Sequence, residues 1–212
     1  MNLTNKIKFS SIIISLIIQF LLLQSCFIVK HGDSEQSYKP IFLSPKPEIT
    51  MSDEIVRSKN GDMIAFLPKD WFFVDVEEKS SSDVFAFAVN PEYTVAAVFS
   101  TRRISDKQDE ILENEGLLGL ARLSMERRMK KTAGAVIQTG KPDVIQMGNL
   151  SFGLYEFSSS GGALKSQSAV FISSIGQFYE FSLIPLDFRL KPIPTELERE
   201  KIFRSMLSTI QY

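Results

Sequence analysis

Two short triplets in the second half of the chain contain the residues best suited to acid–base chemistry. Tyr155-Glu156-Phe157 and Tyr179-Glu180-Phe181 each place one glutamate between two aromatic residues. Two carboxylates can divide the roles of general acid and general base, as in glycoside hydrolysis. If the triplets lie on strands of a meander that are separated by one strand, two inter-strand spacings put Glu156 and Glu180 about 10 Å apart. That is just beyond the range of about 6.5–9.5 Å for inverting glycosidases, so a pair would need side-chain adjustment. The alternative is that each glutamate pairs with a nearby Arg or Lys, or faces solvent on a partly covered sheet.

The other residue types that commonly perform catalysis or bind metals are scarce. Cys26 is the only cysteine and His31 the only histidine, which excludes an internal disulfide and a Cys-rich metal site and disfavours a Ser-His-Asp arrangement. We expect His31 to be a solvated linker residue. The nucleophile-elbow, S-x-x-K, P-loop and H-E-x-x-H motifs are absent from the sequence. The stretch Gly148–Gly153 lacks the lysine or helix start of a phosphate loop and predicts a β-turn. The sequence therefore predicts no cofactor and no metal site.

Composition limits the class of protein further. The 212 residues include 24 Lys+Arg and 25 Asp+Glu, a formal net charge of -1, and 44% are hydrophobic. Such a chain has enough apolar surface to form a core, which excludes wholesale disorder. The near-neutral balance also argues against a nucleic-acid partner, whose phosphates require an excess of basic side chains.

The start of the chain carries the strongest localisation signal. Lys6 and Lys8 precede Ile12–Leu23, which is almost wholly apolar. This stretch is shorter than the ~20 residues of a membrane-spanning helix and has the length of a signal-peptide hydrophobic region. It ends in Leu23-Gln24-Ser25-Cys26, which resembles the lipobox of bacterial lipoproteins. The resemblance implies that a signal peptide, residues 1–25, is removed, and that fatty acids such as palmitate are attached at the new terminal cysteine.

A lipid anchor at Cys26 would hold the protein at a membrane of the bacterial cell envelope. Two or three acyl chains anchor stably, because each buried CH2 contributes about 0.8 kcal/mol and a single chain is marginal. Phe27, and not an aspartate, follows the cysteine, and by resemblance to enterobacterial lipoproteins this favours the outer membrane and a domain that faces the periplasm. The alternative is that Cys26 ends an uncleaved signal anchor.

The rest of the chain divides into a tether and one domain. Prolines and small polar residues in 26–52 predict a flexible linker after the lipidated cysteine, and 53–212 predicts a single α+β globular domain. Period-2 patterns and turn residues predict strands at 54–57, 62–66, 72–76, 84–89, 94–103, 135–139, 144–147, 151–158, 166–174 and 178–184. Apolar stripes at helical spacing predict two helices, preceded by capping boxes at Ser105 and Thr195. Gly116 weakens the first helix, so its firm part is expected from near Glu115.

Two groups of residues suggest a partner surface. Arg127, Arg128, Lys130 and Lys131 close the first predicted helix, where they could bind a partner or could simply complement the helix dipole. Trp71 stands beside two phenylalanines at a strand start, where it could form a recognition patch or part of the core.

The order of elements resembles the Mog1/PsbP-like family. The resemblance rests on an early turn with Pro68 and Trp71, a mid-chain helix, a meander containing Phe152–Phe157, and an amphipathic C-terminal helix. It implies an α/β/α sandwich around an antiparallel sheet. It transfers no function, because the family includes both photosystem extrinsic subunits and a small-GTPase binder.

Three functions follow as hypotheses. The leading one is a non-enzymatic envelope lipoprotein that binds another envelope protein or helps to assemble a complex. The second is a module that binds a small ligand or a lipid in a cavity between sheet and helices. The third is a carboxylate-based hydrolase that uses Glu156 and Glu180.

Overall fold

A computed structural model of the chain describes residues 43–75, 83–102, 106–159, 162, 164–187 and 191–212. The predicted signal peptide, Cys26, His31 and most of the predicted linker lie outside the described residues. None of the helices in the described ranges has the length and hydropathy needed to cross a membrane.

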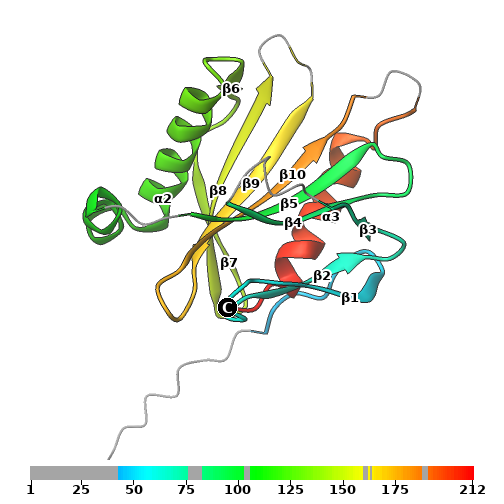
Figure 1. Cartoon of the computed structure of the whole chain (residues 1–212), viewed down its shortest axis with the longest axis horizontal. Helices are drawn as coiled ribbons and strands as arrows, with labels where there is room; N and C mark the ends of the chain where they lie inside the picture. Colours follow the sequence, from blue (N-terminus) through cyan, green and yellow to red (C-terminus); the bar gives the residue numbers. More distant parts are fainter. Residues whose placement is uncertain (1–42, 76–82, 103–105, 160–161, 163, 188–190) are drawn as a thin grey trace, which may run out of the picture. The chain divides into compact units, whose positions relative to one another are not determined.

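An antiparallel sheet of eight strands organises the domain (Figure 1). Its strands, in spatial order, are β3 (Phe72–Phe73), β4 (Val84–Val89), β5 (Val95–Arg102), β10 (Phe178–Pro185), β9 (Lys165–Ile172), β8 (Leu150–Ser159) and β6 (Val136–Gln138), and β7 (Asp143–Met147) also pairs with β8. A separate hairpin joins β1 (Met51–Arg57) to β2 (Ile64–Pro68). The two described helices are α2 (Asp106–Lys131) and α3 (Glu196–Thr209). The predicted α+β class is confirmed.

The helices cover opposite faces of the sheet (Figure 1). On one, the α2 face, α2 packs on β6, β7, β8 and β9, and Leu120, Met125 and Tyr155 are buried between them. On the other, the α3 face, α3 and the β1–β2 hairpin cover a larger core that includes Phe181 and Phe203. Because side chains alternate along each strand, neighbouring residues contribute to different cores.

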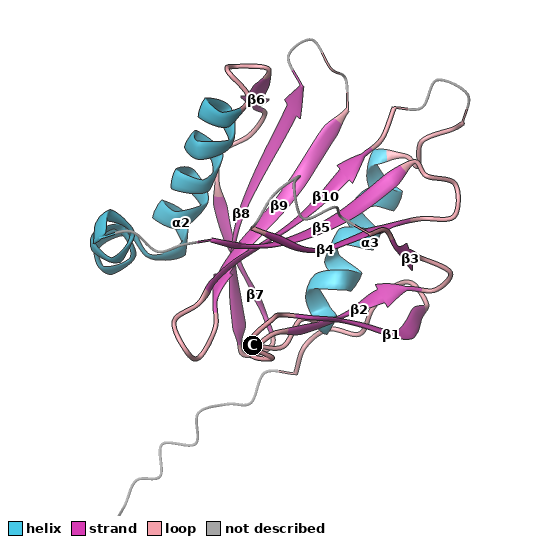
Figure 2. Ribbon diagram, in the orientation of Figure 1, coloured by secondary structure: helices cyan, strands magenta, loops and turns pink. Residues whose placement is uncertain are grey.

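Helix α2 bends where the sequence indicates a weak point. Gly116 has φ 63° and ψ -150° inside the helix, a conformation that glycine tolerates well. Figure 2 shows that the helical path changes direction at this end of α2. Gly116 thus separates two helical segments: one lies before it, and the second begins close to the firm start that we expected near Glu115. Just beyond the bend, the backbone of Leu117 approaches β8 so closely that a Cβ added to Gly153 would lie 2.5 Å from the Leu117 carbonyl oxygen.

The chain also packs on the domain before residue 53. Strand β1 begins at Met51, and further upstream the Glu48 N–H donates to Ser205 Oγ at 2.9 Å. The last part of the predicted linker is therefore bound to α3. At the start of α3 the predicted capping box is confirmed, with reciprocal hydrogen bonds between Thr195 and Glu198.

Candidate functional site

Glu156 and Glu180 do not form a catalytic pair. They lie on β8 and β10, separated by β9 as expected. Glu156 pairs with Gln167 on β9, and Gln167 pairs with Leu183 on β10. Leu183 is three residues from Glu180, an odd number, so the two glutamates point to opposite faces of the sheet. The two-carboxylate hypothesis is therefore wrong, because it considered the strand spacing but not the register.

Glu180 is a buried structural anion. It is 1% exposed beneath α2 and accepts hydrogen bonds from Arg128, from Ser124, from Arg102 Nη2 at 3.0 Å and from the Tyr155 hydroxyl at 2.9 Å. Burial alone would raise the pKa of Glu180, but the guanidinium charges of Arg128 and Arg102, together with the hydrogen bonds from Ser124 and Tyr155, outweigh burial and lower the pKa to about 2. Burial and the nearby Glu180 charge raise the pKa of Tyr155 to about 12. The alternative that Glu180 pairs with arginine is confirmed.

The four basic residues at the end of α2 do not form one surface. Arg128 turns inward to Glu180, and its side chain is 19% exposed. Lys131 reaches Asp83, with 3.7 Å between the ammonium and carboxylate groups. Arg127 is half-buried and Lys130 is exposed. Arg128 therefore belongs to the packing between helix and sheet, and the expected partner surface loses its central residue.

Trp71 is not a surface patch either. It is 6% exposed and lies in the core of the α3 face, so the core alternative is the one that the structure shows. The neighbouring Phe73 is exposed at this edge of the sheet, with 44% of its surface accessible.

The opposite edge of the sheet is a single strand interrupted by a bulge. The Thr139 N–H donates to the Glu156 carbonyl at 3.1 Å, which continues the pairing of β6 with β8. The next paired residue along this edge is Asp143 of β7, which lies opposite Leu154 of β8. Residues 140–142 therefore face only one residue of β8. A bulge of this kind bends an edge strand and interrupts its ladder. The two strands predicted here are confirmed, but the sequence did not show that they share one edge.

The outer side of β7 carries backbone groups that bond to no second strand in the described part of the chain. The Val144 N–H is accepted by the carboxylate of Asp143 at 2.8 Å and so points away from β8. In an antiparallel ladder every second residue faces outward, so Gln146 also directs its backbone groups away from β8. Among the described residues, β7 pairs with no strand other than β8. Val144 itself is 44% exposed. The outer side of β7 can therefore accept another strand.

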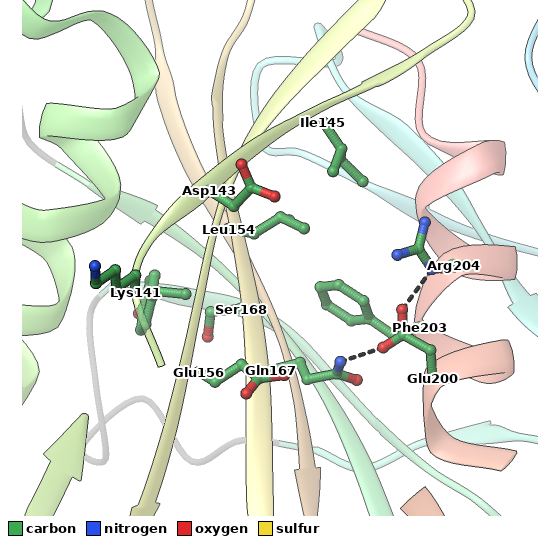
Figure 3. Close-up of a pocket in the computed structure, with 11 residues that line it drawn as sticks. Lys141, Asp143, Ile145, Leu154, Glu156, Gln167, Ser168, Glu200, Phe203 and Arg204 are labelled. Atoms are coloured by element: carbon green, nitrogen blue, oxygen red, sulfur yellow. Dashed lines mark hydrogen bonds and ion pairs between the residues drawn. The ribbon is translucent and has the colours of Figure 1, made fainter. Parts of the chain in front are cut away.

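A pocket opens on the α3 face beside this edge (Figure 3). It exists because α3 packs on β2 and leaves part of β7, β8 and β9 without a helix directly above. Its volume is about 170 Å³, below the range of about 300–1,000 Å³ of typical small-molecule sites. Its lining residues are Lys141, Asp143, Ile145, Leu154, Tyr155, Glu156, Gln167, Ser168, Glu200, Phe203 and Arg204. The pocket has the size of one side chain and not of a lipid.

The charges around the pocket are unevenly paired. Glu200 on α3 is held by Arg204 and Gln167, as Figure 3 shows. Asp143 and Glu156 form no ion pair with any residue in the described part of the chain. The pocket therefore offers two carboxylates outside the ion pairs of the described residues; the Glu156 charge also helps to raise the pKa of Lys165, which is itself paired with Glu196. Within the described residues, no group of three or more His, Cys, Asp or Glu is placed to hold a metal ion.

Sequence reasoning identified Glu156 but missed the rest of this site. Pro142, directly before β7, is the signal that could have marked an edge, because proline is confined to edge strands, strand starts and bulges. No local sequence pattern indicated that Glu200 and Arg204 of α3 would line the same pocket.

Comparisons with known proteins agree with the fold. No protein-family model matches the sequence, and no curated protein matches it. Among solved structures, the chain is similar to cyanobacterial PsbP (CyanoP) from Synechocystis, with a TM-score of 0.55 and 14% identity over 75% of this chain and 92% of that one. A weaker likeness, with a TM-score of 0.41 and 11% identity, is to LpqN of Mycobacterium tuberculosis, described as involved in cell envelope biogenesis, and covers 76% of this chain and 90% of that one. The domain thus has a PsbP-like α+β fold.

Proposed function

We propose that this protein is a non-enzymatic module of the bacterial cell envelope, anchored through a lipid at Cys26, whose domain binds another envelope protein. The observation that supports it best is the outer side of β7, where the Val144 N–H faces away from the sheet beside a pocket of side-chain size. Addition of a strand to an exposed sheet edge is a common way for a domain to bind an extended segment of a partner. The anchor and the periplasm-facing position rest on the lipobox resemblance.

Two observations favour this function over the alternatives. Glu156 and Glu180 lie on opposite faces of the sheet, so they cannot act as the carboxylate pair that the hydrolase hypothesis required. The pocket volume of about 170 Å³ is too small for a lipid or a typical metabolite. A strand edge with a small adjoining pocket suits an extended polypeptide better than a small ligand.

Site-specific photo-crosslinking in the native envelope tests the proposal. A photoreactive residue at Gln146, on the outer side of β7, should crosslink the full-length anchored protein to one partner in near-stoichiometric amounts. The same residue at Glu113, exposed on α2, is the control and should give no such product. A partner captured equally from both positions would argue against an edge interaction.

Two substitutions at one position separate backbone pairing from side-chain contact. Val144→Pro removes an N–H that bonds only to the Asp143 side chain, and proline is tolerated where a strand N–H faces solvent. It should abolish the Gln146 crosslink without changing the far-UV spectrum or the thermal unfolding midpoint. Val144→Ala keeps the N–H and should preserve the crosslink. An unchanged crosslink in Val144→Pro would contradict the proposed mode of binding.

A further inference from the structure

The pocket beside β7 indicates which side chains a bound segment must carry. We infer that the β7 edge selects an extended segment in which a lysine or arginine enters the pocket and meets the carboxylates of Asp143 and Glu156. This inference rests on the proposed function and adds the chemistry of the partner.

The strand geometry brings such a side chain to the pocket. A strand added to β7 would lie about 5 Å from β7 and about 10 Å from β8. Asp143 and Ile145 pair with β8 residues of the α3 face, so every second side chain of the added strand lies on that face, beside the pocket. Lysine and arginine have stems long enough to cross an apolar strand surface and place their charge beyond it. A shorter side chain would end above β7.

The bulge leaves the route to Glu156 open. Gly140 carries no side chain at the point where the edge passes Glu156, and a Cβ there would lie 3.5 Å from Glu156 Oε2. The Glu156 carboxylate thus extends to the edge and is not covered by the strand outside it. Ile145, Leu154 and Phe203 form the apolar part of the lining, against which an aliphatic stem can pack.

The charges of the pocket lining favour a positively charged side chain in the bound segment. The charged residues of the lining are two basic and three acidic, namely Lys141, Arg204, Asp143, Glu156 and Glu200. Arg204 is already bound to Glu200, whereas Asp143 and Glu156 form no ion pair within the described residues. Lys165, on which the Glu156 charge acts, is itself paired with Glu196. An incoming carbonyl would replace the Asp143 carboxylate on the Val144 N–H and free it for the basic side chain. A glutamate in the same place would face two like charges.

Fluorescence anisotropy with the full chain in non-ionic detergent tests this selection. The probes are three fluorescein-labelled peptides in which threonine alternates with lysine, glutamine or glutamate. At low salt the lysine peptide should bind roughly tenfold more tightly than the glutamine peptide, as expected for a charge-assisted hydrogen bond, and the glutamate peptide should bind least. Glu156→Gln should remove most of the lysine preference, whereas Glu113→Gln, a matched change on α2, should leave it intact.

The outcomes distinguish the inference from the proposed function. Equal binding of the lysine and glutamine peptides, both lost in Val144→Pro, would overturn the selection of a basic residue but keep the edge as the binding site. Lysine-peptide binding could instead survive Val144→Pro, or fall as much in Glu113→Gln as in Glu156→Gln. Either result would indicate general attraction to an acidic surface and would overturn the inference. No binding of the lysine peptide at millimolar concentration would overturn it as well, and the crosslinking experiment would still decide whether the edge binds a protein.

Discussion

Replacing Glu180 with glutamine should destabilise the domain by about 3–5 kcal/mol at neutral pH, the usual cost of removing one partner from a buried ion pair. The carboxylate is 1% exposed, and the two arginine side chains that bind it are 17% and 19% exposed. Without it, Arg102 and Arg128 would keep their charges beneath α2 with no buried counter-charge. The loss should be large because most of each arginine side chain stays buried and keeps its charge.

The same interaction predicts a pH dependence with a definite sign. Although burial would raise it, the pKa of Glu180 is lowered from 4.5 to about 2 by the charges of Arg128 and Arg102 and by the hydrogen bonds from Ser124 and Tyr155. Each pKa unit corresponds to 1.36 kcal/mol, so ionised Glu180 contributes about 3 kcal/mol of stability. Because the folded-state pKa is the lower one, this contribution is fully present above the unfolded-state value near 4.5 and is lost as pH falls towards 2. The stability difference between wild type and Glu180→Gln should therefore shrink by about 3 kcal/mol between pH 6 and pH 2.

Urea unfolding followed by tryptophan fluorescence measures this difference. Trp71 is the only tryptophan and is 6% exposed in the core, so its emission should change when the domain unfolds. Glu156→Gln is the matched control, since it alters the glutamate of the other Tyr-Glu-Phe triplet at a half-buried position. It should change stability by no more than about 0.5 kcal/mol. A wild-type advantage over Glu180→Gln that stays constant down to pH 2 would refute the assignment of Glu180 as a buried, ionised partner of two arginines.

Two further predictions concern the helix contact and the anchor. Gly153→Ala should lower the free energy of unfolding by about 1–3 kcal/mol, because the new Cβ would lie 2.5 Å from the Leu117 carbonyl oxygen. Gly140→Ala is the control, since its nearest neighbour would lie at 3.5 Å, and it should change the thermal unfolding midpoint little. Equal midpoints for both variants would contradict the close packing of α2 on β8. Cys26→Ser should leave the precursor unprocessed and unlabelled by radioactive palmitate in the native host, and labelling at the wild-type level would show that the lipid is not attached at this residue.

Much of the secondary structure could be predicted because it depends on neighbouring residues. The Asn60-Gly61 pair is a local signal for the turn between β1 and β2, since glycine readily adopts positive φ, and Gly61 has φ 75°. The capping box of Thr195 and Glu198 predicted the start of α3, because both partners lie within one helical turn. The order of β8, β9 and β10 followed from short turns between consecutive strands.

The roles of the charged residues depended on contacts between distant parts of the chain. Glu156 and Glu180 stand in the same local triplet, yet the register across β9 turns one to the pocket and the other to the buried arginines. Arg128 lies among three other basic residues, yet its position on α2 directs it to Glu180, 52 residues further along the chain. The edge position of β7 likewise depends on which strands pair elsewhere in the sheet. Sequence alone determined where strands and helices form, because periodicity and caps are local. Only the tertiary structure decided which face each charge occupies and which edge stays open, because a shift of one residue in register exchanges the two faces.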